Sequence, residues 1–192
     1  QGNFRQAIQD YTQAIELNPD LAEAYVNRGL TYGEQGKLDE AIQDLNQAIE
    51  LNPDDADAYY NRGVVYREQE KLDEAIQDLN QAIELNPDDA DAYYNRGVVY
   101  REQGKLDEAI QDLNQAIELN PDYALAYNDR GATYYKQGKL DEVIQDLNQA
   151  IELNPDYALA YYNRGVVYDE QGNSQQAIQD YTQAIEINPD YA

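Results

Sequence analysis

Clustered acidic side chains are the groups in this sequence whose type and spacing come nearest to a chemical site. The run Asp54-Asp55-Ala56-Asp57 offers three carboxylates, and calcium binds such oxygen ligands. Counted from Asp54, however, the run lacks the Gly at the sixth place and the Glu at the twelfth that an EF-hand loop requires. We therefore interpret this run as a cap at the start of a helix.

Adjacent acids form a second candidate, because two carboxylates could act as a catalytic acid and base. The pair Asp39-Glu40 recurs, however, at Asp73-Glu74, Asp107-Glu108 and Asp141-Glu142. Each pair falls in the first turn of a predicted helix, where carboxylates interact favourably with the helix dipole and remain in water. We interpret all four pairs as solvated helix starts.

Most catalytic and metal chemistry is excluded by composition. The chain has no Cys, His or Trp, and its one serine is Ser174, so neither a Ser–His–Asp nor a Cys–His nucleophile can be assembled. Structural zinc nearly always requires Cys or His, and no glycine-rich phosphate loop is present. We expect a protein that is not an enzyme and that needs no metal or cofactor.

The net charge of −25 over 192 residues narrows the choice of partners. Binding to nucleic acid requires clustered Lys and Arg, so the charge argues against it. It favours basic partners, although acids on outer helix faces also serve simply to keep a surface solvated. No apolar run is long enough for a membrane span, and no signal-like segment is present, so we expect no membrane insertion and a cytoplasmic location. The chain contains no Met, not even at position 1, and we expect it to be part of a longer protein.

A repeat of 34 residues organises the whole chain. The 33 residues 37–69 recur letter for letter as 71–103. Such a period is typical of a stacked repeat array. Within one period, apolar residues at helical spacing predict a helix from Leu38 that ends at Asn52, because Pro53 disfavours helical geometry in the residue before it. Asp54 or Asp55 can cap the following helix.

Columns of identical residues carry a family resemblance. The first helix of each period holds Tyr, Gly and Tyr, as in Tyr59, Gly63 and Tyr66, and the second holds Ala and Leu, as in Ala75 and Leu79, before a closing Pro. This pattern resembles the tetratricopeptide repeat (TPR), with Tyr for its usual Trp, Leu mostly for Phe, and Arg in a column that is usually Leu. The resemblance implies an all-α, right-handed superhelical α-solenoid of helix-turn-helix units with about eleven helices. The expected divisions are the second helix of a truncated repeat in 1–21 and five repeats in 22–55, 56–89, 90–123, 124–157 and 158–192, with no separate capping helix.

Two structural details can be predicted from these columns. Gly closes the turn inside most repeats, where a left-handed residue is needed, but Glu70 takes that place in one repeat and should be strained there. The Arg column that includes Arg62 should pair with the Asp column that includes Asp78, mainly to fix helix register. The alternative is that these Arg side chains reach a ligand.

The resemblance also implies where a partner lies, because the first helices of TPR units line a concave groove. The expected groove residues are Asn27, Tyr60, Asn61, Val64, Arg67, Tyr94, Asn95, Val98, Arg101, Asn128, Tyr135, Tyr162, Asn163 and Val166. Tyr and Val supply stacking and apolar contact, and Asn can bond the backbone of an extended peptide. The alternative is that these Tyr rings pack against the neighbouring repeat. Clamp-type binding of a C-terminal carboxylate is disfavoured, because Tyr or acids replace the clamp lysines.

The leading functional interpretation is a protein–protein interaction scaffold that binds a peptide or helix of a partner in this groove. We expect that segment to be neutral to basic, with apolar or aromatic residues. The alternative is a structural spacer or self-assembly module without a peptide ligand. It is supported by the near-identical repeats and by a last helix whose outer face, around Ile178, Tyr181 and Ile185, has no following helix to cover it. That face predicts end-to-end homo-association.

Overall fold

The computed structural model describes residues 2–191, and over that range it contains eleven α-helices, a short 3-10 helix and no strand. The first helices of the pairs are α2 (Ala22–Glu34), α4 (Ala56–Glu68), α6 (Ala90–Glu102), α8 (Ala124–Lys136) and α10 (Ala158–Glu170). The second helices are α1 (Gly2–Leu17), α3 (Leu38–Leu51), α5 (Leu72–Leu85), α7 (Leu106–Leu119), α9 (Leu140–Leu153) and α11 (Ser174–Ile187), which is followed by η1 (Pro189–Tyr191). The predicted all-α fold of eleven helices is confirmed.

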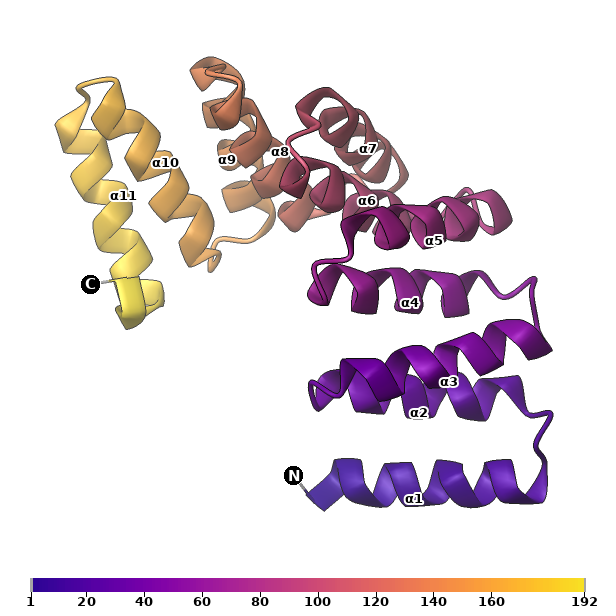
Figure 1. The fold of residues 1–192 in the computed structure, drawn as a ribbon. Helices are drawn as coiled ribbons and strands as arrows, with labels where there is room; N and C mark the ends of the chain where they lie inside the picture. Colours follow the sequence, from indigo (N-terminus) through magenta and orange to yellow (C-terminus); the bar gives the residue numbers. More distant parts are fainter. Residues whose placement is uncertain (1, 192) are drawn as a thin grey trace. The chain divides into compact units, whose positions relative to one another are not determined.

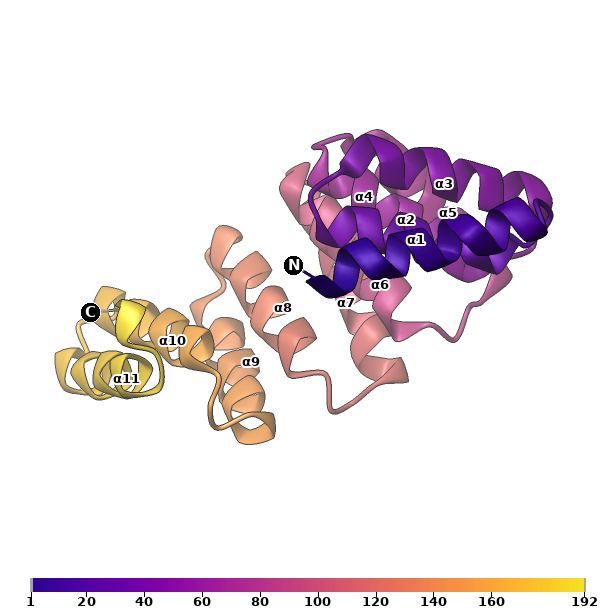
Figure 2. The ribbon, with the colours of Figure 1, turned by 90° about the horizontal axis from the view of Figure 1, so that it is seen from below.

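The chain forms two compact units, Gln1–Val99 and Tyr100–Ala192. In the first unit, α1 to α5 are stacked in chain order, each against the next (Figure 1). In the second unit, α8, α9, α10 and α11 follow one another in the same way (Figure 2). No helix within residues 2–191 combines the length and apolar composition that crossing a membrane requires.

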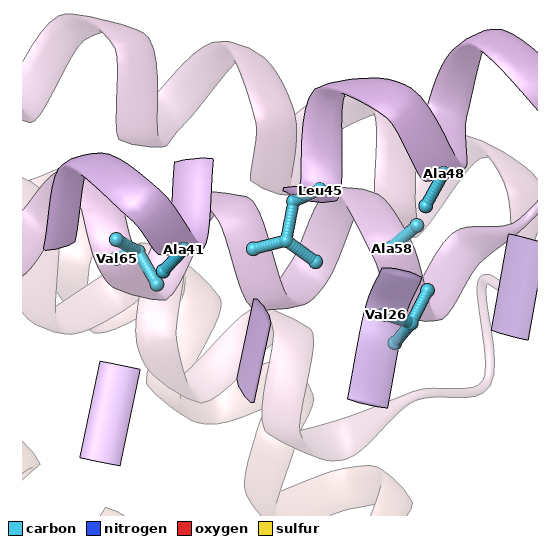
Figure 3. Close-up of a cluster of buried hydrophobic side chains, with 6 residues drawn as sticks. All are labelled: Val26, Ala41, Leu45, Ala48, Ala58 and Val65. Atoms are coloured by element: carbon cyan, nitrogen blue, oxygen red, sulfur yellow. The ribbon is translucent and has the colours of Figure 1, made fainter. Parts of the chain in front are cut away.

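The core of the first unit is built around α3, whose apolar face was predicted from its periodicity. Leu45 is fully buried and lies between Val65 and Ala41 on one side and Ala48 with Ala58 on the other (Figure 3). Since α4 belongs to the next repeat, one leucine joins two repeats. Burying such a side chain contributes about 1.5–3 kcal/mol. Leu79 holds the same position in the next repeat, and Leu113 and Leu147 hold it in the second unit.

The helix cap and the left-handed turn residues that the sequence predicted are present in the structure. Asp55 caps α4 by accepting hydrogen bonds from the backbone N–H groups of Asp57 and Ala58. The glycines that end the first helices have positive φ, as Gly104 does at 77°. Glu70 takes the same left-handed conformation with a φ of 59°, so the strain predicted at this residue is confirmed.

The predicted Arg–Asp pairs are present in both units. Each arginine donates from Nε and Nη2 to the two carboxylate oxygens of an aspartate sixteen positions later, over 2.6–2.9 Å. The pairs are Arg28–Asp44, Arg62–Asp78, Arg130–Asp146 and Arg164–Asp180. These guanidinium groups therefore lie between helices, where their hydrogen bonds are made to protein side chains.

A third bond from each arginine was not predicted. Nη1 donates to a side-chain oxygen sixteen positions earlier, on the second helix of the preceding repeat, over 2.6–3.0 Å. The acceptors are Thr12, Asn46, Asn80, Asn114 and Asn148. One guanidinium group thus joins three consecutive helices, which fixes the spacing on which any binding face depends.

The last helix, α11, agrees only in part with its prediction. Ile178 is 63% exposed and Ile185 is 37% exposed, as expected of a face without a following helix. Tyr181 does not lie on that face. Its ring packs on α10, where a Cβ added to Gly165 would come within 2.7 Å of it. Tyr181 occupies the leucine column of the core, so the sequence pattern should have assigned it inward.

Candidate functional site

In the first unit, three of the predicted groove residues line a pocket of about 470 Å3 between α2 and α4. Asn27, Tyr60 and Asn61 all line it, together with Val26 and Leu30. The remaining lining residues are the acids Glu23, Asp55 and Asp57. The pocket therefore combines apolar and amide surface with a negative charge, which suits a neutral or basic segment.

Tyr60 lines the pocket and also packs inside the protein. Its ring packs against Ile83 of its own repeat and Ala92 of the next, and its hydroxyl accepts a 3.1 Å hydrogen bond from Nδ2 of Asn95. Burial first, and then the nearby carboxylate of Asp91, raise the pKa of Tyr60 above its ordinary value. Tyr60 is half-buried and lines the pocket, and it also packs against the neighbouring repeat, which was the alternative interpretation of these tyrosines.

Asn95 is committed to the protein. Besides Tyr60, its Nδ2 donates to the backbone oxygen of Asp91 at 2.9 Å, and its Oδ1 accepts from Nη1 of Arg67 at 3.0 Å. Both amide donors are thereby used, so Asn95 cannot donate to a partner's backbone carbonyl while these contacts persist. Val98, one turn along α6, is also buried. Val64 and Tyr94 are half-buried.

In the second unit, the predicted residues gather around a smaller and more apolar pocket of about 300 Å3 between α8, α9 and α10. Tyr135, Asn163 and Val166 are members of the predicted set that line it. The other lining residues are Ala132, Lys136, Val143, Leu147 and Val167. Tyr135 is 37% exposed, and its hydroxyl donates a hydrogen bond to Glu170 on α10, which raises the pKa of Tyr135.

The remaining predicted residues of this unit differ in their accessibility. Tyr162 is 39% exposed, and its ring lies beside those of Tyr181 and Tyr191, with centroids 5.8 and 5.3 Å away. Asn128 is only 2% exposed, and its Oδ1 accepts a hydrogen bond from Nδ2 of Asn163. Arg101 forms a 2.8 Å ion pair with Asp129. Asn128 therefore supports the face from beneath, while Tyr162 forms part of its surface.

A ladder of bonds between successive first helices was not predicted. Tyr60–Asn95 and Asn128–Asn163 join residues 35 apart, and Arg67–Asn95 and Arg101–Asp129 join residues 28 apart. The signal was present as adjacent columns in the repeat, but one repeat alone does not show which column meets which in the next. Over the described residues 2–191, no three His, Cys, Asp or Glu side chains gather in a way that could hold a metal ion.

The helix pairs and the columns that hold them agree with models of one repeat family. The TPR repeat model matches residues 1–36, 34–69, 65–101, 99–138 and 131–172, and the tetratricopeptide repeat model matches 158–191. The chain belongs to the tetratricopeptide repeat family. Repeats of this family generally form non-enzymatic scaffolds. A comparison with curated proteins found no match.

Solved TPR structures are similar to this chain over most of its length. The crystal structure of YrrB, described as a TPR protein with an unusual peptide-binding site, is 31% identical, with 94% of this chain and 93% of that chain covered and a TM-score of 0.73. A MamA crystal structure is 26% identical over 84% of this chain and 95% of its own, with a TM-score of 0.76. PilF of Pseudomonas aeruginosa is 22% identical over 87% of this chain and 76% of its own, with a TM-score of 0.81. At that identity the similarity shows only that the two proteins share a fold.

Proposed function

We propose that this TPR chain is an interaction scaffold that binds a peptide or helix of a partner protein along the faces of its first helices. One observation carries the proposal: in each unit, residues predicted from the sequence line a pocket on that face. The similarity to YrrB, a peptide-binding TPR protein, supports the same function. We further propose the repeat divisions given above, with a partial repeat at 1–21 followed by five repeats.

The partner segment is neutral to basic and carries apolar or aromatic side chains. Glu23, Asp55 and Asp57 surround the first pocket, and the chain as a whole carries a net charge of −25. Such a field attracts basic segments and disfavours acidic ones. Leu30 and Tyr162 supply exposed apolar surface on the two faces. Asn95 and Asn128 position their neighbours and do not touch the partner.

Selection from a peptide display library tests the proposal. The variant Leu30→Ser/Tyr162→Ser removes exposed apolar surface from both faces with little effect on the core. Gln43→Ser/Gln145→Ser is the matched control, because both glutamines are exposed on second helices. A shared peptide motif that binds the original chain and the control, but not the first variant, is the expected result. Recovery of no motif, or equal binding to all three proteins, would overturn the proposal.

The second candidate function is self-association through α11, and the exposure of Ile178 and Ile185 favours it. Two such faces could cover each other in a symmetric contact. Light scattering over a range of concentrations would show association that Ile178→Lys/Ile185→Lys abolishes. A monomer at every concentration would exclude this function for the chain.

A further inference from the structure

The repeat that contains α8 and α9 departs from the others at two positions that face each other. Ala132 on α8 stands where the other repeats have a larger side chain, and Val143 on α9 stands where they have alanine. The corresponding residues are Leu30, Val64, Val98 and Val166 in the first column and Ala41, Ala75, Ala109 and Ala177 in the second. Compared with the other repeats, Ala132 therefore removes at least two methyl groups from the binding face, and Val143 adds two methyl groups to the layer beneath it.

The larger Val143 is accompanied by a wider spacing between its two helices. In the repeat of α4 and α5, a Cβ added to Gly63 would lie 3.0 Å from Cγ of Leu79 and 3.3 Å from the backbone oxygen of Ala75. The nearest atoms to the same Cβ on Gly131 are Cβ of Asp146 at 3.5 Å and Cγ of Leu147 at 3.6 Å. The α8–α9 pair is thus less tightly packed by several tenths of an ångström.

Together the two changes account for the pocket of about 300 Å3 in the second unit. Its floor is formed by Val143 and Leu147, core residues that are 2% and 1% exposed, and Val166 and Val167 form the α10 side. Ala132 forms the opening where a valine side chain would otherwise stand. An apolar cavity of about 150 Å3 is enough to bind benzene, so this pocket has room for a six-membered ring and the atoms that attach it.

The rim of the pocket favours an aromatic occupant. Tyr135, which is held at the edge by its hydrogen bond to Glu170, presents an exposed ring against which another aromatic ring can pack. Lys136 is the charged residue among those that line the pocket, but Glu170 is bonded to Tyr135 at its edge, and the chain as a whole carries a net charge of −25. Flanking Lys or Arg residues would therefore complement the protein.

We propose that this pocket binds one aromatic side chain of a basic partner segment and acts as the anchor that selects it. The inference rests on the proposed function, because it assigns a specific side-chain preference to the binding face of the second unit. The other repeats retain a branched side chain at the Ala132 position, and Gly29 and Gly63 are packed more tightly than Gly131.

The test uses the blocked peptide Lys-Lys-Phe-Lys-Lys, with Leu and Ala versions at the central position, and the whole chain with labelled Leu and Val methyl groups. The Phe peptide should shift the methyl signals of Val143, Leu147, Val166 and Val167 in nuclear magnetic resonance spectra. The Ala peptide should bind at least about tenfold more weakly, since it lacks the buried ring. Equal binding of the Leu and Phe peptides would overturn the aromatic preference.

Filling the pocket supplies the matched variant. Ala132→Val introduces the residue that three other repeats have, so it should fold normally and abolish the methyl shifts. Gln43→Ser, an exposed change on a second helix of the other unit, should leave them unchanged. Phe-peptide binding that Ala132→Val does not weaken would overturn the pocket assignment while the scaffold function stood. Failure of the display library to yield any peptide would instead contradict the proposed function itself.

Discussion

Arg62 and Asp78 form a two-point ion pair in which Nε donates to Oδ2 and Nη2 to Oδ1, each over 2.7 Å. The same guanidinium group donates from Nη1 to Asn46 at 2.7 Å and lies over the rings of Tyr59 and Tyr66. It therefore ties α3, α4 and α5 together. Burial alone would lower the pKa of Arg62, but the hydrogen bond and charge of Asp78 outweigh it and raise that pKa. The arginine remains charged throughout the useful pH range.

Removing one partner of this pair should be costly. Asp78→Ala leaves a largely buried guanidinium without its carboxylate, so we expect a loss of about 3 kcal/mol in the free energy of unfolding. Urea denaturation followed by circular dichroism measures it, with Glu84→Ala, an exposed acid on the same helix, as the control. The double variant Arg62→Met/Asp78→Leu should recover most of the loss. If it were as unstable as Asp78→Ala, the pair would add net stability instead of fixing register.

The sequence predicted this pair because both of its columns repeat without exception. It did not predict the bond to Asn46, for a physical reason. That acceptor belongs to the preceding repeat, and its column changes from Thr12 to Asn46, so periodicity alone does not mark it as paired. Contacts within a repeat follow from helix geometry, whereas contacts between repeats also require the stacking distance.

Glu70 offers a test of stored backbone strain. A left-handed conformation is unfavourable for a residue with a Cβ, so Glu70→Gly should stabilise the chain by about 1 kcal/mol. Gly104→Ala is the matched reverse change: its φ is 77° and an added Cβ would meet no atom within 4 Å, so only the backbone is affected. It should destabilise by a similar amount in the same denaturation assay. Changes of the same sign in both variants would contradict this explanation.

The difference in helix spacing predicts opposite effects for two equivalent glycines. Gly131→Ala should be neutral or stabilise by up to about 1 kcal/mol, because its Cβ meets only ordinary contacts and alanine favours a helix. Gly63→Ala should destabilise by about 1–3 kcal/mol, because its Cβ is crowded by Leu79 and a backbone oxygen. Thermal unfolding ranks the two variants. Equal losses would show that α8 and α9 are as tightly packed as α4 and α5.

The sequence predicted which repeat positions lie on the candidate binding face more reliably than it predicted what each residue does there. Tyr135, Asn163 and Val166 do line one pocket, and the helix that carries each was correctly assigned. The roles expected of the asparagines were harder to predict, because Asn95 and Asn163 bond the previous first helix. A sequence shows that an amide lies on a face, but only the position of the neighbouring helix shows whether its hydrogen bonds are already used.

Tyr157 should make the folded chain less stable at alkaline pH. Burial first, and then the negative charge of Asp129 and the proximity of Tyr191, raise its pKa from the ordinary value of about 10 to about 12. The folded chain therefore holds this proton more tightly than the unfolded chain does. As the pH rises above 10, the unfolded state ionises first and is favoured, so this contribution to stability is complete below pH 10 and lost as the pH approaches 12.

The melting temperature should fall over that range, and it should fall less in Tyr157→Phe, which has no phenol to ionise. Tyrosinate absorbance, compared between the two proteins, identifies the late-titrating group. Identical pH profiles would show that Tyr157 ionises as readily in the folded chain as in the unfolded one.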